Sequence, residues 1–165
     1  MWQRVFESMR WHRWRGRQIA KRFFSNKHLN KIAKQIKLSE EGHSGEIVVA
    51  IEAASPEHEE KSYLRAREVF GRLGVWDTPL NTGVLLYIAL DKRCIELIAD
   101  RGINVPAEQW QRVCQHLQEA FSRQEYFDGV MRAICEIEGL LRDGTPKKET
   151  AEELNYLANQ PVILP

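Results

Sequence analysis

The sequence predicts an α/β fold, a three-layer α/β/α sandwich built around a small mixed sheet. An apolar, β-rich run at 46–53 is followed by a helical pattern and a second apolar run at 84–90. This strand–helix–strand order implies a parallel pair with a right-handed crossover. A third run at 94–99 follows after only a polar turn at 91–93, which predicts an antiparallel hairpin. Helical patterns on either side of these runs favour helices on both faces of the sheet.

The chain's 165 residues favour one domain. Composition divides it into a basic, tryptophan-rich N-terminal arm (1–24), an α/β domain (25–142) and a C-terminal tail (143–165). Within the arm, Gly16 weakens any single continuous helix. The tail ends in the apolar stretch QPVILP, which we expect to dock on the domain or on a neighbouring molecule.

The elements of the domain follow in order along the chain. Ser25 or Asn26 can cap a helix whose apolar residues recur at helical spacing. The strand at 45–54 is nearly all apolar, which is typical of a strand covered on both faces. Pro56 then predicts a helix start. Its expected first turn holds the acidic residues Glu57, Glu59 and Glu60.

Two further helices are predicted after the hairpin. Pro106 begins the first, with Glu108 near its start and apolar residues on one face. The second runs from about Tyr126 to Leu141 and carries its own apolar face. Together they supply the helices that complete the sandwich.

Charge is distributed very unevenly along the chain. Residues 1–37 hold eleven lysines and arginines against one glutamate, a net charge of +10, so the remainder carries −9 within a total of +1. Arginine interleaved with tryptophan suits an anionic membrane surface or a protein partner, and we rank nucleic acid behind these. The arm could instead pack on its own acidic domain. The arm residues expected to make such contacts are Trp2, Trp11, Trp14, Arg10, Arg13, Arg15 and Arg17.

The sequence also excludes several classes of protein. No stretch reaches the roughly 20 apolar residues of a membrane span, and the first 24 residues lack the apolar core of a secretory signal. The three cysteines, Cys94, Cys114 and Cys135, contain no CxxC pair, which argues against a disulfide framework or a zinc site. We therefore expect a cytoplasmic protein, with peripheral membrane association as the variant that the arm suggests.

The strand directions predict where polar groups converge. If the runs at 46–53 and 84–90 are parallel, both begin at one edge of the sheet, and the antiparallel run at 94–99 ends there. Glu46, the loop 77–82 and the segment 100–102 should therefore meet. The oxygen-bearing side chains of this predicted site are Asp77, Asn81 and Asp100, with Glu46 and Thr82 nearby and Arg101 and Gly102 beside them.

Two interpretations of this convergence remain open. Hard cations such as Ca²⁺ take six to eight oxygen ligands, many of them from carboxylates, so Ca²⁺ is the cofactor that the residues suggest. Alternatively, Asp100 caps a turn and Arg101 forms a structural ion pair, with no ligand bound.

The chain resembles the TPM domain family, which includes plant thylakoid-lumen proteins and many bacterial proteins. The resemblance is carried, over about residues 40–142, by GEIVVAIEAA, by LGVWDTPLNTGVLLYIALDKRCIELIADRGI and by FSRQEYFDGVMRAICEIEGLL. It implies a compact α/β/α sandwich and a cytoplasmic-looking bacterial branch of the family. It also implies cation binding by loops at one end of the sheet, with Asp77, Asn81, Asp100, Arg101 and Gly102 at the matching positions.

The resemblance and the residues together leave three hypotheses about function. The first is a TPM-like binding or accessory domain with a divalent-cation site at one end of the sheet. The second is a weak, metal-dependent acid phosphatase, which the resemblance alone suggests. The third is a docking module that reaches a membrane or a protein partner through the basic arm.

Overall fold

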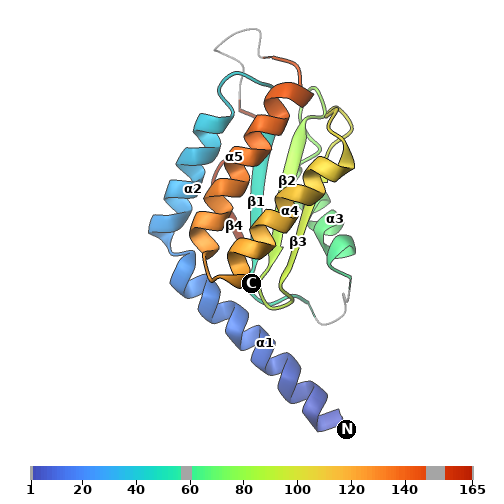
Figure 1. Ribbon diagram of the computed structural model, residues 1–165. Helices are drawn as coiled ribbons and strands as arrows, with labels where there is room; N and C mark the ends of the chain where they lie inside the picture. Colours follow the sequence, from blue (N-terminus) through green and yellow to red (C-terminus); the bar gives the residue numbers. More distant parts are fainter. Residues whose placement is uncertain (1, 57–60, 148–154, 165) are drawn as a thin grey trace.

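A mixed four-stranded sheet in the order β3-β2-β1-β4 forms the centre of the computed structural model (Figure 1). The structure describes residues 2–56, 61–147 and 155–164, and side chains from Trp11 onward. Its strands are β1 (Glu46–Glu52), β2 (Gly83–Ala89), β3 (Cys94–Ala99) and β4 (Val162–Leu164). β1 pairs with β2 in parallel and β2 pairs with β3 in antiparallel orientation. The predicted parallel pair and hairpin are therefore confirmed.

Five helices surround this sheet in the part of the chain that is described. They are α1 (Trp2–Phe23), α2 (Asn26–Ser39), α3 (Ser62–Arg72), α4 (Ala107–Ser122) and α5 (Tyr126–Gly144). Figure 1 shows α2, α4 and α5 on one face of the sheet and α3 on the other. This arrangement confirms the three-layer sandwich.

Both faces of the central strands are buried, as the apolar sequence of β1 predicted. Ile47 and Val49 pack in the larger core, beneath α2, α4 and α5. Val48 and Ala50, which alternate with them, pack in the smaller core beneath α3. Successive side chains of a strand point to opposite faces, so a strand between two helical layers needs apolar residues at every position.

The C-terminal segment contributes an edge strand that the sequence did not predict. β4 pairs in parallel with β1, with Val162 opposite Ala50. The expected docking of the final apolar residues on the domain is confirmed: these residues dock by pairing their backbone with that of β1. A strand of three residues is too short to produce a readable hydrophobic period.

The helix predicted to start at Pro56 begins later, because α3 starts at Ser62 and Pro56 is not helical. Residues 57–60, including the predicted acidic first turn, lie outside the described residues. Asp91 in the β2–β3 turn holds the chain as it leaves β1, because its carboxylate accepts hydrogen bonds of 2.8 Å from both the N–H and the hydroxyl of Ser55. The chain is therefore tied to the hairpin before the helix starts.

α1 is one continuous helix, so the expectation that Gly16 weakens it is wrong. A Cβ atom at residue 16 would lie 2.0 Å from the carbonyl oxygen of Ala53. Glycine is required there because α1 crosses the end of β1 at backbone contact. Beyond this crossing, Ile19 and Phe23 pack against the larger core. The N-terminal half of α1 projects away from the sandwich (Figure 1).

Candidate functional site

The predicted convergence of chain segments occurs at the end of the sheet where β1 and β2 begin, which we call the rim. Glu46 is paired with Gly83 in the β1–β2 register. The N–H of Asp100, which follows β3, donates to the carbonyl of Gly83 at 2.9 Å. The N–H of Glu46 donates to Thr82 at 3.1 Å. Three segments far apart in the sequence therefore meet at the rim.

The loop before β2 is tied to the segment after β3 by close backbone packing. The N–H of Gly102 donates to the carbonyl of Asn81 at 2.8 Å, and the guanidinium of Arg101 lies 3.3 Å from Asn81 Oδ1. A Cβ atom at residue 102 would lie 2.0 Å from the carbonyl oxygen of Leu80, which explains the glycine. Asn81 has a φ of 54°, a left-handed conformation that asparagine tolerates better than most residues.

Two of the predicted oxygen ligands make structural hydrogen bonds at the rim. The Glu46 carboxylate is buried and accepts the N–H groups of Tyr156 at 3.1 Å and Leu157 at 2.6 Å. The hydroxyl of Thr82 donates to the carbonyl of Ser44 at 2.7 Å. Glu46 therefore fastens the C-terminal segment, on its way to β4, against the start of β1.

The remaining acidic residues of the rim differ in environment. One carboxylate oxygen of Asp100 accepts the N–H of Arg101 at 2.7 Å. The other, Oδ2, is buried and makes no hydrogen bond within the described parts of the chain. Asp77 is exposed in the same loop as Asn81. Among residues 2–56, 61–147 and 155–164, no group of three or more His, Cys, Asp or Glu side chains is arranged to hold a metal ion, so the calcium site stays a prediction.

Comparison with known proteins identifies the fold's family. The model of the TPM domain matches residues 20–140. The chain belongs to the TPM domain family. A similar solved structure is the NMR structure of the BA42 protein from the psychrophilic bacterium Bizionia argentinensis, with a TM-score of 0.73 and 26% identity. That similarity covers 84% of this chain and 94% of BA42. No match was found among curated proteins.

In this TPM domain, α1 carries exposed aromatic and basic side chains at the end of the sheet opposite the rim, while other exposed aromatic residues such as Trp76 lie elsewhere. Trp11 and Trp14 are each 56% exposed, and their ring centroids lie 6.5 Å apart. The guanidinium of Arg15 lies 5.8 Å from the centroid of the Trp11 ring, within cation–π range. Arg17 is exposed and Arg13 is half-buried. The side chains of the predicted contacts Trp2 and Arg10 lie outside the described residues.

The family match begins at residue 20, so most of α1 lies before it. Nevertheless, α1 is not separate from the TPM domain, because Phe23 packs at 4.9 Å from Tyr126 at the start of α5. None of the helices in the described residues combines the length and apolar character needed to cross a membrane.

A buried charged cluster lies beneath α3 and was missed at the level of sequence. Glu52 is completely buried at the end of β1. Its carboxylate accepts hydrogen bonds from Arg65 of α3, at 3.1 Å from Nε and 2.5 Å from a terminal guanidinium nitrogen. It also accepts a hydrogen bond from the hydroxyl of Tyr87 on β2. The bond to Glu52 raises the pKa of the Arg65 guanidinium above its ordinary value. Burial, followed by the bond to Glu52, raises the pKa of Tyr87 far above its ordinary value.

This cluster had a readable signal in the sequence. A glutamate at the end of a strand covered on both faces must find a partner, because an unpaired buried charge is very costly. Arginine is the partner whose fork of donors matches a carboxylate. The cluster fixes α3 to the sheet, because Arg65 of α3 donates to the Glu52 carboxylate of β1.

Proposed function

We propose that this chain is a TPM-family binding domain that docks on an anionic membrane surface through α1. The observation that carries the proposal is the pair of half-exposed tryptophans, Trp11 and Trp14, on the segment of α1 next to the sandwich. The two rings adjoin each other, with centroids 6.5 Å apart, and adjoining exposed apolar side chains mark interaction sites more often than single ones do. Arginines accompany them on the same helix.

The chemistry of α1 fits a membrane surface. Indole rings settle at the level of lipid headgroups, where one side of the ring contacts acyl chains and the N–H stays hydrated. Each lysine or arginine held near an anionic bilayer contributes about 1 kcal/mol of attraction. The arm, residues 1–24, holds seven lysines and arginines against one glutamate, so the same attraction would orient the domain with α1 toward the bilayer.

The crossing at Gly16 supports this role mechanically. Because α1 contacts the backbone at the end of β1 there and is packed on the core from Ile19 onward, the tryptophans are held at a fixed position relative to the sandwich. A membrane bound by Trp11 and Trp14 would therefore face the end of the sheet that holds the β2–β3 turn. The rim, at the other end of the sheet, would remain free for a separate ligand.

Vesicle binding tests the proposal with a matched control. Wild-type protein should co-sediment with phosphatidylserine-containing vesicles and much less with pure phosphatidylcholine vesicles. Replacing both Trp11 and Trp14 by alanine should lower binding by roughly tenfold or more, since burying a large apolar side chain is worth about 1.5–3 kcal/mol. Trp76→Ala is the control, because Trp76 is 54% exposed in the loop before β2. Equal loss in the control, or no loss in the Trp11/Trp14 variant, would contradict the proposal.

A divalent-cation site at the rim is the second candidate function. It is favoured by Asp100 Oδ2, a carboxylate oxygen that is buried without a hydrogen bond in the described region. Asp77, Asp100 and backbone carbonyls of the loop would supply oxygens, which are the ligands that Ca²⁺ prefers. Glu46 is not available to such a site while it holds the backbone of Tyr156 and Leu157.

Calcium titration followed by residue-resolved NMR tests the rim. Saturable shifts at Asp77 and Asp100, lost in Asp100→Asn, would support cation binding; a flat titration would refute it. Asp100→Asn, together with Asp77→Asn, also tests the phosphatase alternative. Hydrolysis of para-nitrophenyl phosphate that disappears in both Asp77→Asn and Asp100→Asn would favour catalysis at the rim over binding alone.

A further inference from the structure

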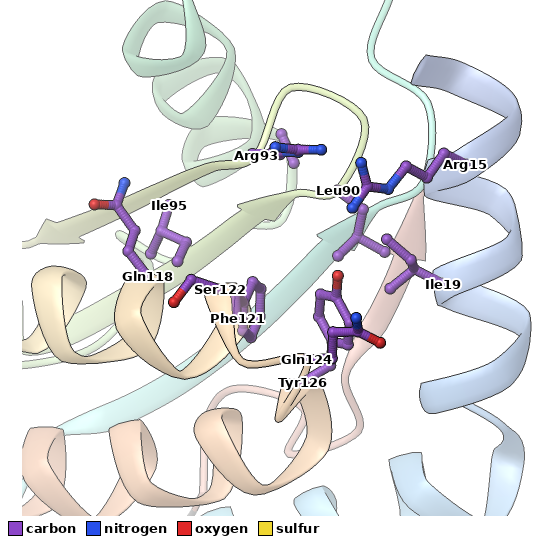
Figure 2. Close-up of a pocket in the computed structure, with 11 residues that line it drawn as sticks. Arg15, Ile19, Leu90, Arg93, Ile95, Gln118, Phe121, Ser122, Gln124 and Tyr126 are labelled. Atoms are coloured by element: carbon purple, nitrogen blue, oxygen red, sulfur yellow. The ribbon is translucent and has the colours of Figure 1, made fainter. Parts of the chain in front are cut away.

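A hollow of about 370 Å³ lies at the end of the sheet opposite the rim, enclosed by α1, the β2–β3 turn and the junction of α4 with α5 (Figure 2). This volume is within the range of small-molecule sites, which is roughly 300–1,000 Å³. Two arginines line it, Arg15 from α1 and Arg93 from the turn. No acidic side chain is among its lining residues, so the hollow carries positive charge.

Neither arginine is neutralised by a carboxylate in the described residues. Arg15 makes a cation–π contact with Trp11, and no ion pair of Arg15 or Arg93 occurs in the part of the chain that is described. Figure 2 shows Arg15 extending from α1 toward Leu90, on the same side of the hollow as Arg93. Two guanidinium groups facing one hollow repel each other, and an anion between them would remove that repulsion.

Tyr126 adds a hydrogen-bond donor to the hollow. Tyr126 is only 8% exposed, and its ring packs between Phe23 and Phe121 with centroid distances of 4.9 Å to each. Its hydroxyl makes no hydrogen bond within residues 11–56, 61–147 and 155–164, and Figure 2 shows it directed into the hollow on the side of Arg15. The hydroxyl can therefore donate a hydrogen bond to an acceptor on a molecule bound in the hollow.

Two lining residues have unusual backbone conformations. Arg93 has a φ of 54° and Gln124 has a φ of 63°, and both are non-glycine residues in the left-handed region. Arg93 is the last residue of the β2–β3 turn and Gln124 follows the end of α4, both positions where left-handed backbone reverses the chain. The turn places the side chain of Arg93 at the hollow, and the end of α4 places the side-chain amide of Gln124 there.

The other walls of the hollow are apolar. Leu90 and Ile95 are buried side chains of the hairpin, and Ile19 and Phe121 contribute from α1 and α4. A fully hydrated inorganic anion would leave this surface without a partner. A molecule that joins an anionic group to an apolar group would satisfy both parts of the hollow.

We propose that this hollow binds a small amphipathic anion, a carboxylate or phosphate ester attached to an apolar chain. Arg15, Arg93 and the Tyr126 hydroxyl contact the anionic group, and Ile19, Leu90 and Phe121 contact the chain. Since α1 supplies one wall, the bound molecule joins the arm to the sandwich. The anionic group can come from a free metabolite or from the headgroup of a bilayer lipid.

The probes are octyl phosphate and octanoate, titrated below their aggregation concentrations and followed by calorimetry and by NMR of the full-length chain. Arg93→Gln and Tyr126→Phe are the test variants. Arg93 is exposed on a turn, and phenylalanine keeps the packing of residue 126, so both should fold with native-like spectra. Arg17→Gln is the matched control, because Arg17 lies on α1, is exposed and does not line the hollow.

The expected result is binding that weakens roughly tenfold or more in both Arg93→Gln and Tyr126→Phe, because each variant loses a hydrogen bond to a charged group. Arg17→Gln should bind like the wild type. No binding of either probe to the folded wild type, or equal binding by all variants, would overturn the proposal.

Vesicles containing phosphatidylserine distinguish the two sources of the anion. If Arg93→Gln and Tyr126→Phe also weaken vesicle binding, the ligand is a lipid headgroup; if vesicle binding is unchanged, it is a free amphipathic molecule. Neither variant alters Trp11 or Trp14. Failure of this site would therefore appear separately from failure of membrane docking by α1.

Discussion

The buried pair of Glu52 and Arg65 allows the sharpest prediction about stability. Arg65→Met keeps most of the side-chain length of residue 65 and removes its charge. Glu52, which has no exposed surface, would then lose its counter-ion and all three hydrogen bonds from the guanidinium. Breaking a buried pair by removing one partner costs about 3–5 kcal/mol, because the remaining charge is left uncompensated. Because the free energy of unfolding of a whole domain is only about 5–15 kcal/mol, a loss of this size should be easy to measure.

An exposed neighbour supplies the control for this prediction. Glu68 pairs with the same Arg65 at 2.8 Å, but its side chain is 50% exposed. Glu68→Gln should therefore cost at most about 1 kcal/mol, the usual value of a surface pair. Urea unfolding followed by circular dichroism at neutral pH measures both variants, with the slope of the transition expected to stay constant.

A combined variant separates a lost contact from an uncompensated charge. Replacing all three members of the cluster, as Glu52→Leu, Arg65→Met and Tyr87→Phe, removes the buried charges together with the hydroxyl that bonds to Glu52. Apolar replacement of a whole buried pair is often neutral, so this variant should recover most of the loss seen in Arg65→Met. The reasoning would be refuted if Arg65→Met cost less than about 1 kcal/mol, or if the combined variant were the least stable of the set.

Three further outcomes follow from contacts in the structure. Gly16→Val should destabilise the chain by about 1–3 kcal/mol or more, as overpacking does, because a Cβ at residue 16 would lie 2.0 Å from the carbonyl oxygen of Ala53. Gly71→Ala is the control in the same thermal melts and should be neutral or stabilising, because a Cβ at residue 71 meets open space. Glu46→Gln should speed hydrogen exchange at the amide of Tyr156, which donates to that carboxylate; unchanged protection would count against the rim's structural role. Burial raises the pKa of the Cys114 thiol to about 11 from its ordinary value of 9, so the folded state binds this proton more tightly than the unfolded state does. The free energy of unfolding should therefore fall between pH 9 and 11 more steeply in the wild type than in Cys114→Ala. Parallel pH profiles of the two proteins would contradict this prediction.

The three central strands could be predicted because their sequences obey simple physical demands. The run EIVVAIE is apolar at nearly every position since helices cover both faces of β1. The short turn at 91–93 leaves no room for a crossover, so β2 and β3 must be antiparallel neighbours. Strand direction alone then placed Asp100 beside the start of β2, where the structure has it.

Other features depended on contacts that no local pattern encodes. β4 is a three-residue strand whose partner lies more than 100 positions earlier in the sequence. Glu46 resembled a metal ligand in the sequence, but it binds backbone amides of the C-terminal segment. Gly16 resembled a helix breaker because the close passage of α1 over Ala53 is visible only in three dimensions. The hollow likewise combines α1, a turn and a helix junction that are far apart in the chain.

The depth of Trp11 in a bilayer is the measurement that tests membrane docking by α1 most directly. A variant that keeps Trp11 as its single tryptophan should show blue-shifted fluorescence with phosphatidylserine vesicles and strong quenching by lipids brominated near the headgroup. A matched variant that keeps only Trp76 should show neither change. Unquenched Trp11 fluorescence in the presence of saturating anionic vesicles would contradict the account.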